Sequence, residues 1–169
     1  MSQRIGIYAG TFDPITNGHI DIVHRALHVV DTVVIAIATG SPKDTLFSAE
    51  ERQQLGEKAL QTLDDSVRKR IEVEYFDGLL VDYVEKKKSN VIIRGLRAVS
   101  DYEYEAQMAL INRHLNPDIE TVFFVTSENC SYISSSIVKN IAANNGDISS
   151  LVPKEVEKAL KANITRIDT

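Results

Sequence analysis

The residues of the chain best suited to chemistry begin directly after a short apolar segment, at positions 10–19, which read GTFDPITNGH. Two glycines in this segment allow a ligand to approach the backbone closely, and His19 falls in the first turn of a predicted helix. The amides and the dipole of a helix N-terminus favour anions, and an imidazole there can donate a hydrogen bond to charge that develops in a transition state. Thr11 adds a hydroxyl. Alternatively, Thr11, Asp13 and Asn17 only make turn and cap hydrogen bonds, and His19 is a solvated helix residue.

Cationic side chains follow two further predicted strands. Lys43 lies in the sequence GSPK, and Arg94 and Arg97 lie in the sequence RGLR, where Gly95 is expected to loosen the backbone directly beyond a strand. Arginine suits phosphate because its planar guanidinium can bond two oxygens at once. The alternatives are a solvated lysine and a pair of salt-bridged arginines. The partners of those arginines would be the acidic residues that follow, Asp101, Glu103 and Glu105.

A serine-rich segment at positions 131–136, with the sequence SYISSS, opens a helix after the last predicted strand. Hydroxyls and free amides at a helix start suit a polyphosphate, although one serine could serve only as an N-cap. Threonine, histidine, lysine, arginine and serine are thus supplied by several loops of a chain whose formal net charge is −5. An anionic ligand with several phosphates would account for local cations on an acidic protein.

Short apolar segments that favour β-strands alternate with segments of helical periodicity. The predicted strands are residues 5–9, 32–38, 71–76, 91–93 and 121–125. The first predicted helix has Asn17 as its N-cap and extends to about residue 30. Ser48 with Glu51, and Ser100 with Glu103, form capping boxes for helices that reach residue 62 and about residue 115. The other predicted helices are residues 79–88, 135–143 and 154–162.

This alternation predicts an α/β fold, namely a single doubly wound, Rossmann-like domain with a five-stranded parallel sheet and helices on both faces. The domain is expected to span residues 1–169, with the C-terminal helices, about residues 135–162, packing on it. Such sheets bind ligands at the carboxyl edge of their strands. We therefore expect chemistry in the loops that follow the strands and none at the opposite edge.

Composition excludes several other classes of protein. A chain of 169 residues, 43% of them hydrophobic, can bury a core without disulfides, and its one cysteine, Cys130, cannot form an internal bridge. The longest apolar stretch, residues 33–38, is too short to span a membrane, and no secretory signal precedes residue 10, so a cytoplasmic location is expected. The acidic net charge and the absence of a basic run beyond residues 86–88 argue against nucleic acid as a partner.

Motifs of other enzyme classes are absent from the sequence. There is no GxSxG, GxxxxGK[ST], GxGxxG or HExxH, which disfavours hydrolases, P-loop kinases and dinucleotide oxidoreductases. His24 and His28 have the i, i+4 spacing of half a metal site, but no third ligand accompanies them, so they are expected to be solvated helix residues.

Four segments carry a resemblance to one known family. They are GTFDPITNGH at 10–19, IIRGLRAVSDYEYE at 92–105, NRHL at 112–115 and YISSSIVK at 132–139. Together they resemble bacterial phosphopantetheine adenylyltransferases, a family of the nucleotidyltransferase superfamily that acts in coenzyme A biosynthesis. The resemblance implies transfer of the adenylyl group of Mg-ATP to 4′-phosphopantetheine, giving dephospho-coenzyme A and pyrophosphate, by in-line attack with no covalent enzyme intermediate.

The resemblance also implies roles for individual residues. His19 would stabilise the transition state at the α-phosphate, assisted by Lys43 and Arg94. The residues expected to hold phosphopantetheine are Thr11, Lys43, Leu80 and Arg94. The residues expected to line the ATP site are Thr11, Phe12, His19, Gly95, Leu96, Arg97, Glu105, Cys130, Ser131, Tyr132, Ile133, Ser134, Ser135 and Ser136. Mg²⁺ would be carried by the substrate phosphates and not by protein side chains. A homohexamer built from two trimers and feedback by coenzyme A are further implications.

Two alternative functions remain at this stage. Adenylyltransferases that act on nicotinate mononucleotide resemble the chain at TFDPxxxGH, but they generally carry arginine where this chain has Lys139 and they lack the RGLRAV block. A nucleotide-binding regulatory module with the same alternation of elements would bind ATP without turnover. The chain also departs from the phosphopantetheine family in two places, because Pro42 directly precedes Lys43 and because Cys130 stands where an aromatic residue is common.

Overall fold

The computed structural model describes residues 3–40, 44–97 and 99–167, and it contains one five-stranded sheet in the order β3-β2-β1-β4-β5. The strands, all parallel, are β1 Ile5–Gly10, β2 Thr32–Ala38, β3 Ile71–Phe76, β4 Val91–Leu96 and β5 Glu120–Val125. The helices are α1 Asn17–Ala26, α2 Ala49–Leu60, α3 Asp65–Arg68, α4 Leu80–Lys86, α5 Val99–Leu115, α6 Ser135–Ala143 and α7 Lys154–Ile167, with a 3₁₀ turn η1 at Glu128–Cys130. The predicted parallel, doubly wound sheet is confirmed.

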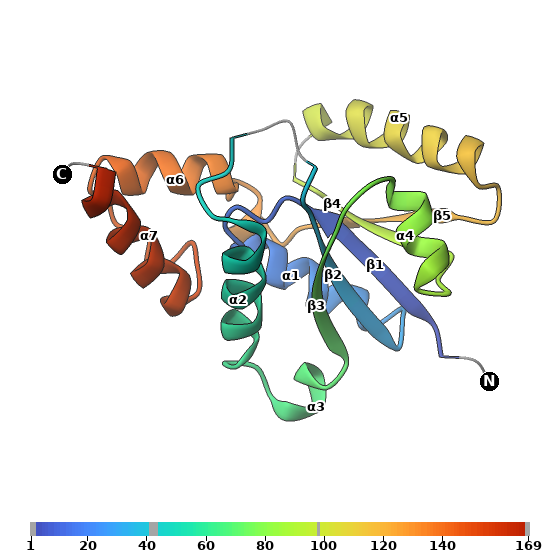
Figure 1. Ribbon diagram of the computed structural model, residues 1–169, viewed down its shortest axis with the longest axis horizontal. Helices are drawn as coiled ribbons and strands as arrows, with labels where there is room; N and C mark the ends of the chain where they lie inside the picture. The colour runs from blue at the N-terminus through green and yellow to red at the C-terminus, as the bar shows by residue number, and fades with distance from the viewer. Residues whose placement is uncertain (1–2, 41–43, 98, 168–169) are drawn as a thin grey trace.

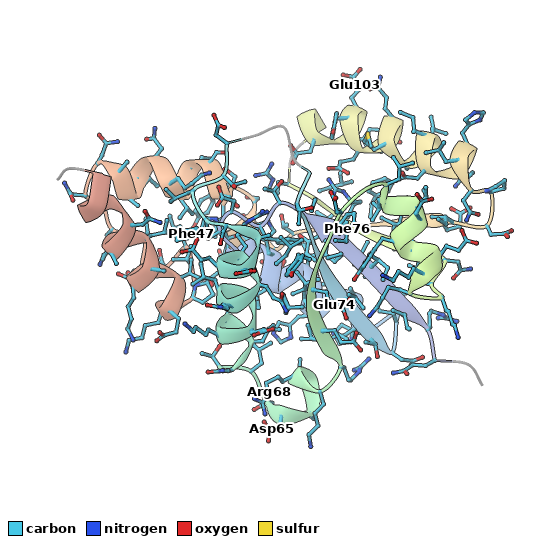
Figure 2. The ribbon with its side chains drawn as sticks, viewed as in Figure 1. Phe47, Asp65, Arg68, Glu74, Phe76 and Glu103 are labelled. Carbon is cyan, nitrogen blue, oxygen red and sulfur yellow. The ribbon has the colours of Figure 1, made fainter. Side chains whose placement is uncertain are left out.

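Helices cover both faces of this sheet (Figure 1), with α1, α2, α6 and α7 on one side and α4 and α5 on the other. Alternate residues of β2 enter different cores, since Ile35 packs with the first group of helices and Val34 packs with α4. All but the last residue of β2 are buried, as expected for a strand that is covered on both faces. Figure 2 labels one aromatic residue of each core, Phe47 beside α2 and Phe76 beside α4.

Strand β4 is longer than the sequence predicted, and this changes the place of Gly95. The strand continues to Leu96 because Arg94, Gly95 and Leu96 pair with Phe123, Phe124 and Val125 of β5. Gly95 therefore lies within the strand and does not loosen the backbone beyond it. A Cβ atom on Gly95 would lie 3.0 Å from Cγ1 of Ile22, so glycine allows α1 to pack closely on β4.

One predicted helix cap is confirmed and one is wrong. Ser48 and Glu51 form the expected capping box of α2. The N-cap of α1 is Thr16 instead of Asn17, because the His19 side chain completes a capping box with the threonine. Helix α5 begins at Val99, one residue before Ser100, and the side chain of Ser100 lies outside what the structure describes, so the predicted box of Ser100 with Glu103 stays a prediction. The acid at its start is Asp101, whose Oδ2 accepts a hydrogen bond from the Arg97 amide at 3.3 Å.

Candidate active site

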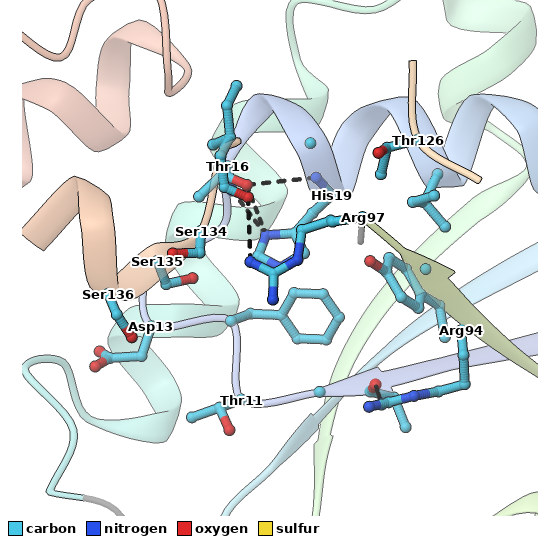
Figure 3. A pocket seen from close by; sticks show the side chains of 18 of the residues that line it. Thr11, Asp13, Thr16, His19, Arg94, Arg97, Thr126, Ser134, Ser135 and Ser136 are labelled. Carbon is cyan, nitrogen blue, oxygen red and sulfur yellow. Dashed lines mark hydrogen bonds between the residues drawn. The ribbon is translucent and has the colours of Figure 1, made fainter. Parts of the chain in front are cut away.

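A cavity of about 480 Å³ lies at the carboxyl edge of the sheet. Its lining comes from β1 and the loop that follows it, from α1, from the loop after β2, from the end of β4, from α5, and from the segment between β5 and the first two turns of α6. Figure 3 shows the serines of α6 on one side of this cavity and Arg94 on the other, with His19 between them. Of the expected site residues, those that line the cavity are Thr11, Phe12, His19, Arg94, Gly95, Arg97, Glu105, Ile133, Ser134, Ser135 and Ser136.

The His19 ring is oriented by the start of its own helix. The Thr16 amide donates a hydrogen bond to Nδ1 of His19 at 2.9 Å, and the Thr16 hydroxyl lies 3.1 Å from the same atom (Figure 3). Because Nδ1 is an acceptor, the proton of the neutral ring resides on Nε2. Burial, assisted by the positive charges of Arg97 and Arg94, lowers the pKa of His19 to about 4. The ring is therefore neutral near pH 7, with an N–H donor available to a ligand.

Aromatic side chains support the histidine. The ring of Phe12 makes an edge contact with His19 at a centroid distance of 4.9 Å and with Tyr8 at 5.2 Å. Phe12 has a φ of 49°, a left-handed conformation that is rare for a bulky residue. Its ring lies over Gly10, where an added Cβ would be 3.1 Å from Cε2 of Phe12. These contacts fix Phe12, and through it the imidazole.

Arg94 is held by an acidic partner from the next helix. Its Nε and Nη2 donate to the two carboxylate oxygens of Glu105, at 2.6 and 2.5 Å, and its Nη1 donates to the Ala9 carbonyl. Burial lowers the pKa of Arg94, but the bonds and the charge of Glu105 outweigh burial and raise it above its usual value. A guanidinium has five N–H groups, so this pairing orients Arg94 and still leaves donors for a ligand.

Arg97 is also paired, although more openly. It forms an ion pair of 3.1 Å with Asp101, one helical turn further along the chain, and its Nη1 donates to the Ile133 carbonyl at 3.4 Å. Both arginines therefore have the salt-bridge partners that the alternative interpretation required, and both also face the cavity. Glu103, the third acid considered, is exposed and points outward from α5 (Figure 2).

The three serines at the start of α6 have different structural roles. Ser134 is the N-cap, since its hydroxyl accepts a hydrogen bond from the Ile137 amide at 3.1 Å. Ser135 donates from its hydroxyl to the Pro14 carbonyl at 2.8 Å, which joins α6 to the loop after β1. Ser136 lines the cavity. The helix start therefore presents its amides to the same space as His19.

Sequence reasoning missed three charged residues that line this cavity, Asp13, Asp44 and Lys139. Asp13 was interpreted only as a turn residue, and Lys139 was not singled out as a site residue. Lys139 lines the cavity, and its Nζ donates to Oδ2 of Asp13 at 2.5 Å. The spacing of Lys139 four residues after Ser135, one turn along α6, was the only signal in the sequence.

Other expected site residues lie elsewhere. Leu80, Leu96, Cys130, Ser131 and Tyr132 do not line the cavity, and Leu80 packs against the core beneath α4. Lys43 lies outside the residues that the structure describes. Its role, like the roles of the other site residues, stays a prediction.

The part of the chain that the structure describes contains neither a cluster of metal-binding side chains nor a helix that could span a membrane. No three His, Cys, Asp or Glu side chains in it are grouped so as to hold a metal ion. No helix in it has the length and apolar character needed to cross a membrane.

Known proteins resemble this chain in both fold and sequence. A putative nicotinate-nucleotide adenylyltransferase from Vibrio parahaemolyticus superimposes with a TM-score of 0.70 at 16% identity, covering 98% of this chain and 96% of that one. A nicotinic acid mononucleotide adenylyltransferase from Plasmodium falciparum, complexed with NaAD, gives a TM-score of 0.71 at 14% identity over 99% and 97% of the two chains. Such low identities show the fold alone, which is that of the nucleotidyltransferases.

Sequence comparison defines the relationship more closely. The cytidylyltransferase-like family matches residues 7–141. The phosphopantetheine adenylyltransferase of Geotalea daltonii is 51% identical over 166 residues, which are 98% of this chain and 100% of that protein. The one from Clostridium perfringens ATCC 13124 is 48% identical over 165 residues, 98% of each chain. The chain belongs to the phosphopantetheine adenylyltransferase family, and the enzyme class expected from the sequence, a nucleotidyltransferase, is confirmed.

Proposed function

We propose that the chain transfers the adenylyl group of ATP to 4′-phosphopantetheine, giving dephospho-coenzyme A and pyrophosphate. The observation that carries this proposal is that His19, Arg94, Arg97 and the start of α6 line one cavity at the carboxyl edge of the sheet. Two polyanionic substrates repel each other, and this arrangement supplies the cations, hydroxyls and amides that would bring them together. The identity to family members over nearly the whole chain supports the choice of substrate pair.

The reaction needs no general base. A phosphate monoester has a second pKa near 6, so the phosphate of phosphopantetheine is largely a dianion at neutral pH and is itself the nucleophile. Its oxygen attacks the α-phosphorus of ATP in line with the departing pyrophosphate, and no covalent enzyme intermediate forms. What the protein must supply is alignment and stabilisation of charge on the pentacoordinate phosphorus.

We assign to His19 the stabilisation of the negative charge that develops at the α-phosphate in the transition state. Its Nε2–H donates a hydrogen bond to a non-bridging oxygen of the α-phosphate, and this bond strengthens as negative charge grows on the oxygen. The Thr16 amide fixes the tautomer that makes this possible. Because the pKa of His19 is about 4, the donor is a neutral imidazole over the physiological pH range.

The two substrates would occupy different ends of the cavity. Phosphopantetheine would be held by Thr11, Lys43, Leu80 and Arg94, with Glu105 keeping the Arg94 guanidinium in place. ATP would lie toward α6, against the residues assigned to it by resemblance, which are Thr11, Phe12, His19, Gly95, Leu96, Arg97, Glu105, and 130–136.

A divalent cation, most simply Mg²⁺, fits the donor set of this cavity. Glu105 is engaged by Arg94, and Asp13 is engaged by Lys139 and two backbone amides. Asp44 is a lining carboxylate that makes no hydrogen bond or ion pair with the described residues. Mg²⁺ keeps several waters and binds mainly to substrate phosphates, so the triphosphate would carry it, and Asp44 would only accept hydrogen bonds from the water ligands of the ion. When bound, it neutralises part of the triphosphate charge.

We also propose a cytoplasmic homohexamer of two trimers that responds to coenzyme A. Helix α5 and the end of β5 leave several large apolar side chains uncovered, and an interface between subunits would bury them. These side chains belong to Tyr102, Tyr104, Leu110, Ile111, Leu115 and Val125. Light scattering of the purified protein tests the assembly, for which six times the chain mass of 18.8 kDa is expected.

The activity is tested by measuring pyrophosphate release from ATP and Mg²⁺ in the presence of either phosphopantetheine or nicotinate mononucleotide. We expect release with phosphopantetheine and none with nicotinate mononucleotide or with ATP alone. Release with nicotinate mononucleotide only would overturn the substrate assignment. Binding of ATP without release under any condition would favour a regulatory module.

A further inference from the structure

Two buried charged side chains, Asp13 and Arg52, form hydrogen bonds with the backbone of the loop after β2. Both residues are only 3% exposed. The carboxylate of Asp13 accepts hydrogen bonds from the amides of Leu46 at 2.9 Å and Phe47 at 3.0 Å. The guanidinium of Arg52, from α2, donates through Nε to the Phe47 carbonyl at 3.1 Å. We refer to Asp13 and Arg52 together as the clasp.

The clasp also binds elements beyond that loop. Nη1 of Arg52 donates to the carbonyl of Thr11 at 2.7 Å and to the carbonyl of Ala38, the last residue of β2, at 3.1 Å. Asp13 pairs with Lys139 of α6. The clasp therefore joins the loop after β1, the end of β2, the loop after β2 and helix α6.

Three of the segments that the clasp joins, the loop after β1, the loop after β2 and helix α6, contribute to the cavity wall. Thr11 and Lys139 line the cavity, and Asp44 and Thr45 line it from the loop after β2. Arg52 does not line the cavity. We propose that Asp13 and Arg52 are positioning residues for adenylyl transfer, which set the distance between the loop after β1 and the loop after β2. This inference rests on the proposed function.

The chemistry of each side chain makes it hard to replace. Arg52 reaches carbonyl oxygens through two separate nitrogens, Nε and Nη1, whereas lysine has one nitrogen and cannot place donors at both positions. Both oxygens of Asp13 are used as acceptors. Asparagine would turn one of them into a donor that faces an amide or the Lys139 ammonium. Each conservative change therefore shifts the loop without creating a large cavity.

Arg70 provides a matched control at the other edge of the sheet. Its guanidinium also donates to backbone carbonyls, those of Leu27 and Val30 at 2.8 Å each and that of Asp31 at 2.8 Å. It joins the turn before β2 to the turn before β3, and neither turn lines the cavity. A purely structural arginine should behave like Arg70, whereas a positioning arginine should change the kinetics of the folded enzyme.

The test is steady-state kinetics of the full-length wild-type protein and of R52K, D13N and R70K, with each unfolding midpoint measured in parallel. A displacement of about 1 Å in reacting groups can cost about 100-fold in rate. For R52K we expect about a 100-fold loss of kcat and about a tenfold rise in KM for phosphopantetheine, with the Kd for ATP within about threefold of wild type. D13N should weaken ATP binding as well, because Asp13 also positions Lys139. R70K should lower the unfolding midpoint and leave kcat and both KM values unchanged.

Amide hydrogen exchange gives a second readout that does not depend on activity. In folded D13N, the Leu46 and Phe47 amides should exchange at least about tenfold faster than in wild type, since they lose their carboxylate acceptor. The proposal is overturned if R52K and D13N lose only stability, if R70K shows the same kinetic loss as R52K, or if the two amides stay protected. Absence of turnover in the wild-type protein would instead show that the proposed function itself has failed.

Discussion

The two edges of the sheet use similar polar side chains for different purposes. At the amino edge, Arg70 and Ser89 donate to backbone carbonyls and close the turns against solvent. At the carboxyl edge, His19 and Arg94 are fixed by equally specific bonds but border a cavity. In parallel sheets the chain leaves each carboxyl end towards a helix N-terminus, so the free amides of helices gather at that edge. The two edges therefore differ less in their residue types than in the presence of a cavity. The functional site is the edge at which oriented hydrogen-bond donors surround that cavity.

The largest expected effect at the carboxyl edge is that of His19→Ala. Loss of one hydrogen-bond donor to a transition-state oxyanion typically costs about 10²- to 10³-fold in rate, so kcat should fall by at least that factor. His24, exposed on the same helix, is the matched control, and His24→Ala should turn over at the wild-type rate. Pyrophosphate release by both folded variants is the measurement. Near-normal turnover of His19→Ala would remove the histidine from the mechanism.

The second prediction concerns how the free energy of unfolding depends on pH, to which His19 at the carboxyl edge of the sheet should contribute. The pKa of His19 is about 4 in the native protein against a usual 6.5, so the unfolded chain takes up a proton first as the pH falls. The free energy of unfolding should be highest above pH 6.5, decrease between pH 6.5 and 4, and change no further below pH 4 on account of this group. A difference of 2.5 units corresponds to about 3 kcal/mol.

His19→Gln isolates this contribution, because glutamine at the third helical position can still accept the Thr16 amide in a capping box. Urea unfolding of the wild-type protein and of His19→Gln measures the free energy of unfolding of each from pH 8 to pH 4. Over this range the free energy of the wild-type protein should decrease by about 3 kcal/mol relative to that of the glutamine variant. A constant gap would mean that the histidine titrates normally in the native protein.

Local sequence was sufficient to predict the strands and part of the site. Apolar β-branched segments predicted all five strands, and the Ser48–Glu51 pair predicted the start of α2 because a capping box involves only neighbours in the chain. Thr16 and Asn17 are both good caps, so the choice between them depended on the His19 ring, which accepts the Thr16 amide. Propensity alone could not decide it.

Contacts between distant residues could not be predicted from one sequence. Asp13 and Lys139 are separated by 126 positions, and their ion pair exists only because β1 and α6 meet at the same edge. The hydrogen bonds of the clasp could not be predicted for the same reason, since the sequence around Arg52 indicates only an amphipathic helix. The end of β4 depended on pairing with β5, which the polar residues of RGLR concealed.

An intermediate effect is expected from Glu105→Gln. Glutamine keeps the shape of the side chain, but its amide nitrogen cannot accept from the Arg94 guanidinium, so one of the two bonds is lost and Arg94 is less well oriented. We expect kcat/KM for phosphopantetheine to fall about tenfold, corresponding to about 1.4 kcal/mol. Isothermal titration with phosphopantetheine checks the binding part. Tighter binding would show that Glu105 mainly masks the charge of Arg94.

The smallest effect on function is expected at the amino edge, from Ser89→Ala. The Ser89 hydroxyl donates to the Ile5 carbonyl at 2.8 Å and accepts from the Val91 amide at 3.1 Å, so it joins the starts of β1 and β4. Losing it should cost about 1 kcal/mol of unfolding free energy, since the site is only partly buried and water can replace the hydroxyl. The ends of β1 and β4 that carry Thr11 and Arg94 lie at the opposite edge, so kcat/KM should stay within about twofold of wild type. A larger kinetic change would mean that the strands transmit displacements along their length, and the site would then depend on both edges of the sheet.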